Sequence, residues 1–206
     1  MVAYIILAAI VVGGILIDQL TKAIVVANMT INESIPIIKD FFHITYITND
    51  GMAFGLADDI RWVFMVFSTI AILGIGVYLF GFCKERMLLK VGLALIVSGG
   101  IGNMIDRIFR YDPIYDCGVV VDMIDFKGIW QFIFNVADAL VCVGAGIVIL
   151  ALILDVIKEQ REKKEKSQKN SEKSTQGGKK EKKSTQNSEN KKAPLDSKEA
   201  KKNDNK

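Results

Sequence analysis

Two apolar stretches of the chain each end in an asparagine that is followed three positions later by an aspartate. Asn103 and Asp106 close the stretch Gly-Gly-Ile-Gly-Asn-Met-Ile-Asp-Arg (99–107), and Asn135 and Asp138 lie in Phe-Asn-Val-Ala-Asp. On a helix, residues three apart share a face, so each asparagine can donate its amide N–H to its own carboxylate or to one on a neighbouring helix. Two carboxylates in one pocket do not both ionise readily, which leaves an acid beside a base. The spacing therefore indicates acid–base chemistry that could activate water against a peptide carbonyl without a metal, a histidine or a nucleophilic serine.

Three acids each lie near one end of an apolar segment, and the distance from the acid to the other end of its segment is nearly the same in all three. Asp106 lies 16 residues beyond Lys90, Asp138 lies 17 residues before the acid that ends its segment, and Asp18 lies 17 residues from the chain start. At the rise of an α-helix these separations are about 24–25 Å. Asp18 with Lys22 could be a simple ion pair at the end of a span. For the other two acids, the cost of a carboxylate at this depth favours a functional role.

The elements that must position these acids are four segments long and apolar enough to cross a bilayer, residues 2–17, 62–83, 88–108 and 129–154. The first lacks a basic start and an A-x-A site, so a retained helix is expected and not a cleaved signal peptide. Aromatic and β-branched residues at 41–48 and around 119–121 predict short strands between the spans. The predicted fold is an α-helical membrane protein with four transmembrane helices and a small extracytoplasmic β-sheet.

Basic residues predict how the spans are oriented. Lys84, Arg86 and Lys90 lie between the second and third spans, and a basic tail follows the fourth. Both regions lie on one side of a four-span protein, and an excess of Lys and Arg marks the cytoplasmic side. Both termini are therefore expected in the cytoplasm, with the three acids near the outer face of the membrane.

The end of the chain differs sharply in composition from the rest. Residues 156–206 hold 17 of the 26 basic and 9 of the 23 acidic residues, and large apolar side chains are scarce. We expect a four-helix membrane domain over 1–157 and a disordered, lysine-rich cytoplasmic tail over 158–206. The tail lacks aromatic residues for base stacking and carries interspersed glutamates, which argues against nucleic acid and favours weak attraction to anionic membrane lipids.

Histidine and cysteine offer little chemistry in this chain. His43 is the single histidine, and no nucleophile motif accompanies it. Cys83, Cys117 and Cys142 are odd in number and show no metal-ligand or C-x-x-C spacing, so we expect packing roles for them. No metal site is predicted.

Four motifs in chain order resemble those of lipoprotein signal peptidase, the signal peptidase II family of bacterial membrane aspartyl proteases. Asp-Gln-Leu-Thr-Lys (18–22) resembles D-Q-x-T-K, and Asn-Asp-Gly-Met-Ala-Phe (49–54) resembles N-x-G-x-A-F. The run 99–107 resembles a glycine-rich stretch that ends in G-N-x-x-D-R, and 134–138 resembles F-N-x-A-D. Each motif alone is weak, whereas four in order on four spans are specific, and the resemblance covers approximately residues 1–157.

The resemblance implies an activity, a substrate and a set of site residues. It places the catalytic dyad on Asp106 and Asp138. The supporting polar and substrate-binding residues that it implies are Asp18, Lys22, Asn49, Gly51, Asn103, Arg107 and Asn135. The implied reaction is hydrolysis of the peptide bond just before a diacylglyceryl-modified cysteine of a prolipoprotein in the bacterial cell membrane, and no cofactor is implied.

Two departures from the family pattern and two rival functions accompany this interpretation. Val-Val-Val-Asp-Met-Ile-Asp-Phe (119–126) resembles a V-V-D-F-like stretch of the family, but a methionine follows Asp122, and no role is assigned to this acid. The lysine-rich tail has no counterpart in the pattern. A small transporter could also use intramembrane acids to carry protons or cations, and Asn-x-x-Asp recurs in two spans that would be antiparallel. An assembly factor without chemistry would leave the matched depth of the acids unexplained.

Overall fold

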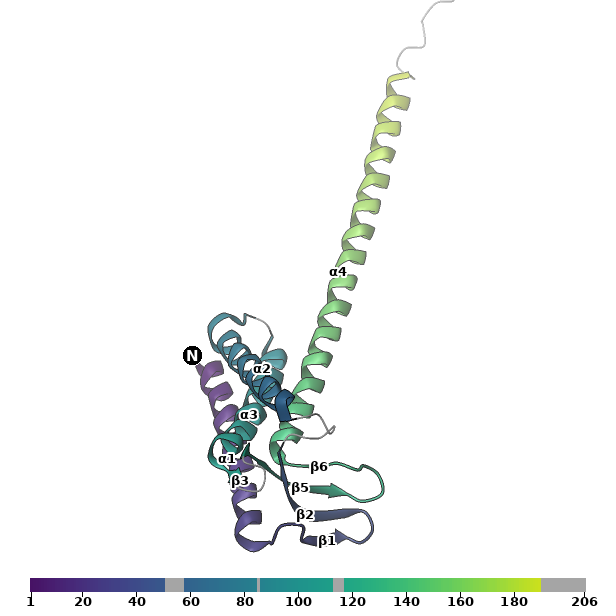
Figure 1. The fold of residues 1–206 in the computed structure, drawn as a ribbon. Coiled ribbons are helices and arrows are strands. Elements are labelled where there is room, and N and C mark those ends of the chain that lie inside the picture. Colours follow the sequence, from purple (N-terminus) through teal and green to yellow (C-terminus); the bar gives the residue numbers. More distant parts are fainter. Residues whose placement is uncertain (51–57, 85, 113–116, 190–206) are drawn as a thin grey trace, which may run out of the picture. The chain divides into compact units, whose positions relative to one another are not determined.

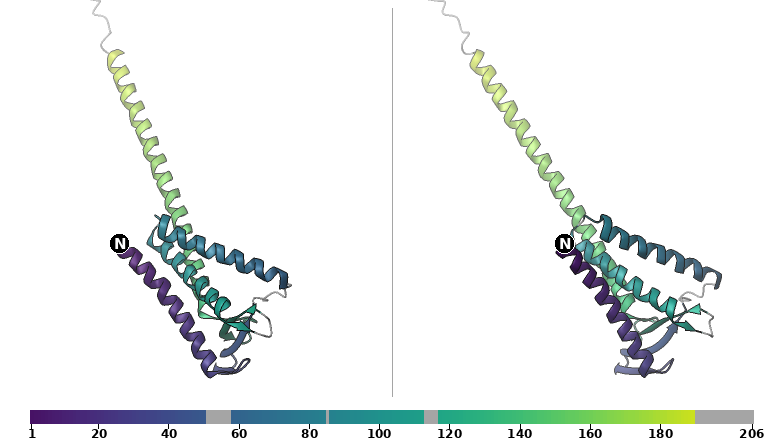
Figure 2. Two further views of the ribbon diagram at one scale, coloured as in Figure 1. Left: turned by 60° about the vertical axis from the view of Figure 1, so that its left-hand side comes forward. Right: turned by 90° about the vertical axis from the view of Figure 1, so that its left-hand side faces the viewer.

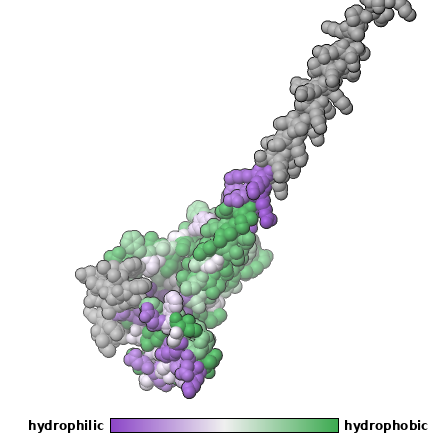
Figure 3. All heavy atoms as spheres, turned by 90° about the vertical axis from the view of Figure 1, so that its right-hand side faces the viewer, coloured by the Kyte–Doolittle hydropathy of each residue, from purple (hydrophilic) through white to green (hydrophobic). Residues whose placement is uncertain are grey.

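The computed structural model describes residues 1–50, 58–84, 86–112 and 117–189. Four of its helices are long and apolar enough to cross a membrane, which confirms the predicted helical membrane fold. They are α1 (Val2–Asn28), α2 (Asp58–Val77, continued by the π-helical turn η1, Tyr78–Phe82), α3 (Met87–Phe109) and α4 (Val136–Glu189). Hydrophobic side chains dominate the visible surface over the helices, whereas hydrophilic ones are interspersed over the sheet (Figure 3).

A four-stranded antiparallel sheet lies at the end of the helices where α1 and α3 finish and α4 begins (Figures 1 and 2). Its order is β1 (Ser34–Ile38), β2 (Phe42–Asn49), β5 (Val120–Phe126) and β6 (Ile133–Phe134). The predicted strands at 41–48 and around 119–121 correspond to β2 and β5. A short hairpin of β3 (Tyr111–Asp112) and β4 (Cys117–Gly118) was not predicted.

Two apolar clusters hold the helices and the sheet together. Between the helices, Leu7 and Val11 of α1 pack with Leu79, Ala94 and Val97. At the end of α1, a second cluster joins the helix to the sheet through Val25, Tyr46, Val121 and Met123. Burial of such side chains removes apolar surface from water and stabilises the contact between α1 and the sheet.

Helix α3 approaches both α1 and α4 closely because glycines line the contact. A Cβ atom added to Gly102 would lie 2.6 Å from Oδ2 of Asp18, and one added to Gly99 would fall on the carbonyl oxygen of Ala137. Small residues allow membrane helices to pack backbone to backbone. These glycines therefore bring Asp18 and the start of α4 against α3.

The fourth helix differs from the prediction at both ends. It begins at Val136 and not at residue 129, because the apolar residues before it form a loop and β6. It continues to Glu189, past the predicted start of the tail at 158, and residues 190–206 lie outside the described part of the chain. Contacts group Met1–Leu154 as one compact unit and Asp155–Lys206 as another.

Candidate active site

Lys22 of α1 is a fully buried ammonium group that joins three acceptors. Its Nζ lies 2.9 Å from Oδ2 of Asp18, 2.9 Å from Oδ2 of Asp106 and 2.9 Å from Oδ1 of Asn103. The ammonium carries three N–H donors, and each finds one acceptor. A buried charge is costly unless it is paired and hydrogen-bonded, so this lysine can lie here only with its acidic neighbours.

Asp106 of α3 is buried completely, and both of its oxygens are occupied. Oδ1 accepts from Nε2 of Gln19 at 3.2 Å and from Nε of Arg110 at 2.9 Å, and Oδ2 accepts from Lys22 and from the backbone N–H of Val121 at 3.2 Å. An ionised carboxylate has about four acceptor sites. The four donors that surround Asp106 fill them and include two cations.

The second Asn-x-x-Asp motif forms the start of α4. Asn135 precedes the first helical residue, and its Oδ1 accepts from the backbone N–H of Asp138 at 2.9 Å, while Oδ2 of Asp138 accepts from the backbone N–H of Asn135 at 3.1 Å. This reciprocal pair is a capping box with aspartate in the third helical position. A further free N–H of the first turn, that of Ala137, donates to Oδ1 of Asp18 at 2.9 Å. The polar residues of α1 and α4 thus fix where the fourth helix begins.

Asp138 is partly exposed and has few partners. Besides the backbone N–H of Asn135 on Oδ2, its Oδ1 accepts from Nδ2 of Asn103 at 2.8 Å. The first asparagine therefore donates across the helix interface to Asp138 and not to Asp106. The described residues give one hydrogen bond to each oxygen, so among them acceptor sites of this carboxylate remain for water or substrate.

Asp122 of β5 lies beside this group, although the sequence assigned it no role. Its Oδ1 accepts from Nδ2 of Asn135 at 2.6 Å, and its Oδ2 accepts from Nδ2 of Asn49 at 2.9 Å. Burial raises the pKa of Asp122 to about 6, the Asn49 hydrogen bond opposes that rise, and the nearby charge of Asp138 adds to it. Asn135 therefore holds both acids, Asp122 through its side chain and Asp138 through its backbone.

The remaining predicted residues lie near Asp122 and Asp138 or outside the described residues. Arg107 is partly buried on α3 and acts electrostatically on Asp138, Asp122 and Asp106. Asn49 ends β2, and Gly51 lies outside the described residues. Within the described residues, no cluster of His, Cys, Asp or Glu could hold a metal ion.

Sequence reasoning missed three members of the site. Gln19 belongs to the first motif, and it donates to Asp18, to the carbonyl of Gly102 and to Asp106. Arg110 follows the third motif, one helical turn beyond Asp106. The family-like V-V-D stretch could have indicated Asp122. For Arg110, the sequence offered only its position one helical turn after Asp106.

Known proteins are similar to this chain in sequence. The signal peptidase (SPase) II family matches residues 10–154. The lipoprotein signal peptidase of Halalkalibacterium halodurans is 42% identical over 155 residues, which cover 74% of this chain and 93% of that protein. Those of Fusobacterium nucleatum and Bacillus subtilis are 40% and 37% identical, over 74% and 79% of this chain and 86% and 97% of their own length.

Two solved structures are also similar to this chain. A bacterial membrane enzyme determined by the in meso method at 2.3 Å resolution superposes with a TM-score of 0.63 at 30% identity, covering 73% of this chain and 88% of that one. A second, determined by the same method at 1.9 Å, gives a TM-score of 0.61 at 30% identity, covering 71% and 91%. The match spans the four helices and the residues of the site, and the chain belongs to the signal peptidase II family of lipoprotein signal peptidases.

Proposed function

We propose that this aspartic endopeptidase uses Asp122 and Asp138 as its two reacting carboxylates. One observation carries this assignment: Asn135 hydrogen-bonds both acids, to Asp122 at 2.6 Å through its side chain and to Asp138 at 3.1 Å through its backbone. A residue that donates to both carboxylates, through two different N–H groups, holds them close together, where a single reacting group can contact both. The substrate is a prolipoprotein, cut before a cysteine that carries a diacylglyceryl group.

The predicted pair of Asp106 and Asp138 is the alternative assignment. Asp106 accepts from two cations, an amide and a backbone N–H, so it offers no free acceptor site to water. In the revised assignment, Asp106 is a positioning residue: it holds Lys22, which holds Asn103, which in turn donates to Asp138.

The reaction follows from two coupled carboxylates that share one proton. The ionised member takes a proton from a water molecule, whose oxygen attacks the scissile carbonyl carbon. The protonated member donates to the carbonyl oxygen, which gives a tetrahedral diol. The carbon–nitrogen bond then breaks as a proton passes to the leaving amine, and the carboxylic acid and the amine separate. The roles of base and acid belong to the pair.

Arg107 and Asn49 support this chemistry from either side of the pair. The guanidinium of Arg107 acts on both Asp122 and Asp138 and can stabilise the negative charge that develops on the carbonyl oxygen. The Asn49 amide donates to Asp122 and limits the rise of its pKa, which keeps the proton exchangeable near neutral pH.

The proposed orientation places this site near the outer face of the cell membrane, with both termini in the cytoplasm. Its support is the position of the site where α1 and α3 end and α4 begins, while the basic residues Lys84, Arg86 and Lys90 lie around the start of α3. A lipid-modified cysteine keeps its acyl chains in the bilayer, so its peptide bond lies near the membrane surface. The catalyst and the bond would then meet at one depth.

The decisive experiment compares three single substitutions in purified protein. Asp122→Asn, Asp138→Asn and Asp106→Asn are assayed for release of the signal peptide from a diacylglyceryl-modified prolipoprotein, with thermal unfolding measured alongside. We expect the first two to abolish cleavage while the protein remains folded. Asp106→Asn should lower the melting temperature, because it leaves Lys22 and Arg110 without their shared acceptor.

Each result bears on one assignment. Near-normal cleavage by Asp122→Asn would return the dyad to Asp106 and Asp138. Failure of folded wild-type protein to cut a substrate that a known signal peptidase II does cut would favour the transporter class instead. The matched control is Asp40→Asn, an exposed acid in the turn between β1 and β2, which should cut normally.

A further inference from the structure

Arg110 lies in the chain between Asp106 and Asp122. Helix α3 ends at Phe109, and Arg110 is the residue that caps it. The backbone N–H of Arg110 donates to the carbonyl of Asp106 at 2.7 Å, and its Nε donates to Oδ1 of the same acid at 2.9 Å. Main chain and side chain of Arg110 thus both bind one buried carboxylate residue.

Further hydrogen bonds join the end of α3 to the start of β5. The backbone N–H of Val119 donates to the carbonyl of Arg110 at 2.9 Å, and that of Val121 donates to Oδ2 of Asp106 at 3.2 Å. Both valines are buried, where a backbone N–H without a partner is costly. Two main-chain groups just before Asp122 are therefore held by Asp106 and Arg110.

Gly118 brings this part of the chain against the end of α3. A Cβ atom added to Gly118 would fall on the backbone carbonyl of Arg107. The chain therefore passes the helix at backbone distance before it enters β5. Together with the two hydrogen bonds, this contact fixes the start of the strand on the helix at three successive places.

Asp106 also connects this strand to the other proposed reacting acid. Its Oδ2 accepts from the backbone N–H of Val121, and the same oxygen accepts from Lys22. Lys22 contacts Asn103, and that asparagine donates to Asp138. One oxygen atom therefore takes part in the contacts that lead to each member of the proposed dyad.

Arg110 determines how this carboxylate is oriented. The last torsion of an aspartate side chain has broad minima, so Oδ2 stays in place only while Oδ1 is held. Oδ1 has two donors among the described residues, Gln19 at 3.2 Å and Arg110 at 2.9 Å. The arginine is charged, and a charge-assisted hydrogen bond is about twice as strong as a neutral one. Of the two, Arg110 contributes more to fixing the carboxylate.

We propose that Arg110 is a positioning residue for catalysis, which holds Asp106 and the start of β5 so that Asp122 lies beside Asp138. Arg110 acts through the strand and not on the substrate. The inference rests on the proposed role of Asp122 and adds the residue that sets the position of this acid. Loss of Arg110 misplaces a reacting group without removing it, and a displacement of about 1 Å can lower a rate about a hundredfold.

Three substitutions at Arg110 test this role. Arg110→Met removes the charge and the donor, Arg110→Gln keeps an N–H donor without the charge, and Arg110→Lys keeps a cation four residues after Asp106. For each purified variant, kcat and KM are measured for signal-peptide release from a diacylglyceryl-modified prolipoprotein, below its melting temperature. Hydrogen exchange of the amides at 119–121 reports whether the start of the strand is still held.

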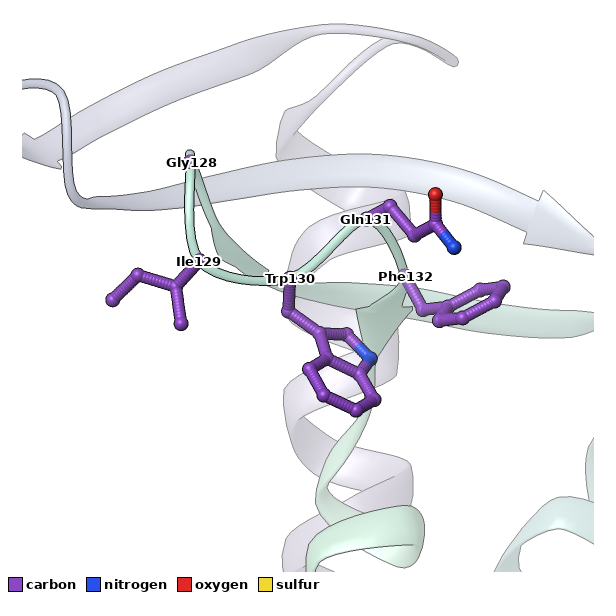
Figure 4. Close-up of a pocket in the computed structure, with 5 residues that line it drawn as sticks. All are labelled: Gly128, Ile129, Trp130, Gln131 and Phe132. Atoms are coloured by element: carbon purple, nitrogen blue, oxygen red, sulfur yellow. The ribbon is translucent and has the colours of Figure 1, made fainter.

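The matched control lies at the other end of the same strand. Lys127 follows β5, and its Nζ lies 2.7 Å from Oδ2 of Asp125. The loop after Lys127 leads to β6, and the residues that line an open pocket there are Gly128, Ile129, Trp130, Gln131 and Phe132 (Figure 4). Lys127→Met therefore also removes an ion pair from β5, but at the end away from Asp106, and it should keep the wild-type kcat.

We expect Arg110→Met to lower kcat about ten- to a hundredfold, because the reacting acid is misplaced. KM should change little, and the amides at 119–121 should exchange faster. Arg110→Lys should recover most of kcat, which a purely structural role would not require, and Arg110→Gln should lie between the two. If Arg110→Met does not stay folded, Arg110→Gln takes its place in the comparison.

The outcomes distinguish this proposal from the proposed dyad. Wild-type kcat in Arg110→Met would overturn the role of Arg110, as would an equal fall of kcat in Lys127→Met, which would mean that any loss of an ion pair on β5 slows the enzyme. Near-normal cleavage by Asp122→Asn, in which Arg110 is intact, would instead overturn the dyad.

Discussion

At the scale of single residues, the site contains two kinds of carboxylate. Asp18 and Asp106 are fully buried and hydrogen-bonded to Lys22, whereas Asp122 and Asp138 are hydrogen-bonded to neutral amides. An acid that accepts from cations is held in place, and an acid beside another acid can exchange its proton. The division separates the residues that build the site from those that would react in it.

The pH dependence of cleavage should report on Asp122. Burial raises its pKa to about 6, and its proton is therefore present below that pH and lost above it. If this proton reaches the scissile carbonyl, kcat/KM should fall as the pH rises through about 6. The Asn49 hydrogen bond lowers this pKa, so Asn49→Ala should move the alkaline limb to higher pH. An alkaline limb that does not move in this variant would separate Asp122 from the rate.

Replacement of Lys22 should destabilise the fold. Lys22→Met leaves Asp18 and Asp106 buried without a shared cation, and breaking a buried pair in this way costs about 3–5 kcal/mol. The melting temperature in detergent should drop clearly. Lys39→Met, at an exposed lysine beside the turn between β1 and β2, serves as the control and should melt like the wild type. Equal melting of both variants would show that the buried pairs add little.

At the scale of elements, the start of α4 matters most, because it carries both the cap and the proposed dyad. The capping box fixes Asp138 in the first turn, and the Asn135 amide reaches Asp122 on the sheet. Ala137 donates to Asp18, so α1 also determines where this helix begins. Displacement of the helix start would separate the two acids.

Two substitutions at Asn135 can separate the cap from the link between the acids. Serine keeps a capping oxygen but has no amide to reach Asp122, whereas alanine loses both. Both variants lose the buried amide, which should lower the free energy of unfolding by about 1–3 kcal/mol. Asn135→Ala should lose about 1 kcal/mol more than Asn135→Ser, because only alanine also removes the cap. Both should cut much more slowly, because both lack the link. Normal cleavage by Asn135→Ser would show that the link is dispensable.

The helices and strands also show how much of the fold could be predicted from the sequence alone. Apolar length predicted all four membrane helices. Asp18 and Asp106, whose equal depth was predicted, both pair with Lys22, and Asn103 links Lys22 to Asp138. The start of the fourth helix was misplaced, because the apolar residues 129–134 fit a strand as well as a helix and periodicity does not distinguish them over so short a run.

Asp122 shows why the proposed dyad was harder to reach from the sequence than the fold. Its partner Asn49 lies 73 positions away and meets it only through the pairing of β2 with β5. Strand register is not visible in one sequence, and a bulge between Ile44 and Ile47 shifts it further. The family-like V-V-D stretch pointed to this acid, but the methionine after it departed from the pattern.

At the scale of the whole molecule, all described site residues lie within the compact unit Met1–Leu154, and the family match ends at residue 154. Beyond it, described ion pairs such as Lys158–Glu162 and Lys163–Glu159 are exposed and local. Such pairs contribute little to stability.

Truncation after Lys164 should therefore leave cleavage unchanged. This cut keeps the full length of the fourth candidate span, which ends at Lys164. Signal-peptide release by the shortened protein is compared with that of the full chain in the same detergent, and a cut after Gly146, inside the span, is the control that should abolish activity. Loss of activity on removal of residues 165–206 alone would assign the tail a part in catalysis or substrate delivery.

The ion pairs of the site also bear on how the chain enters the membrane. Asp18 pairs with Lys22 within α1, and Asp106 pairs with Arg110, the residue that follows α3, each four residues apart. Each helix therefore brings its own counter-charge during biogenesis, before its neighbours arrive. The contact between Lys22 and Asp106 then forms between two groups that each already have a partner in their own segment. Neither Asp18 nor Asp106 then has to enter the membrane without a counter-charge, although both are fully buried in the finished protein.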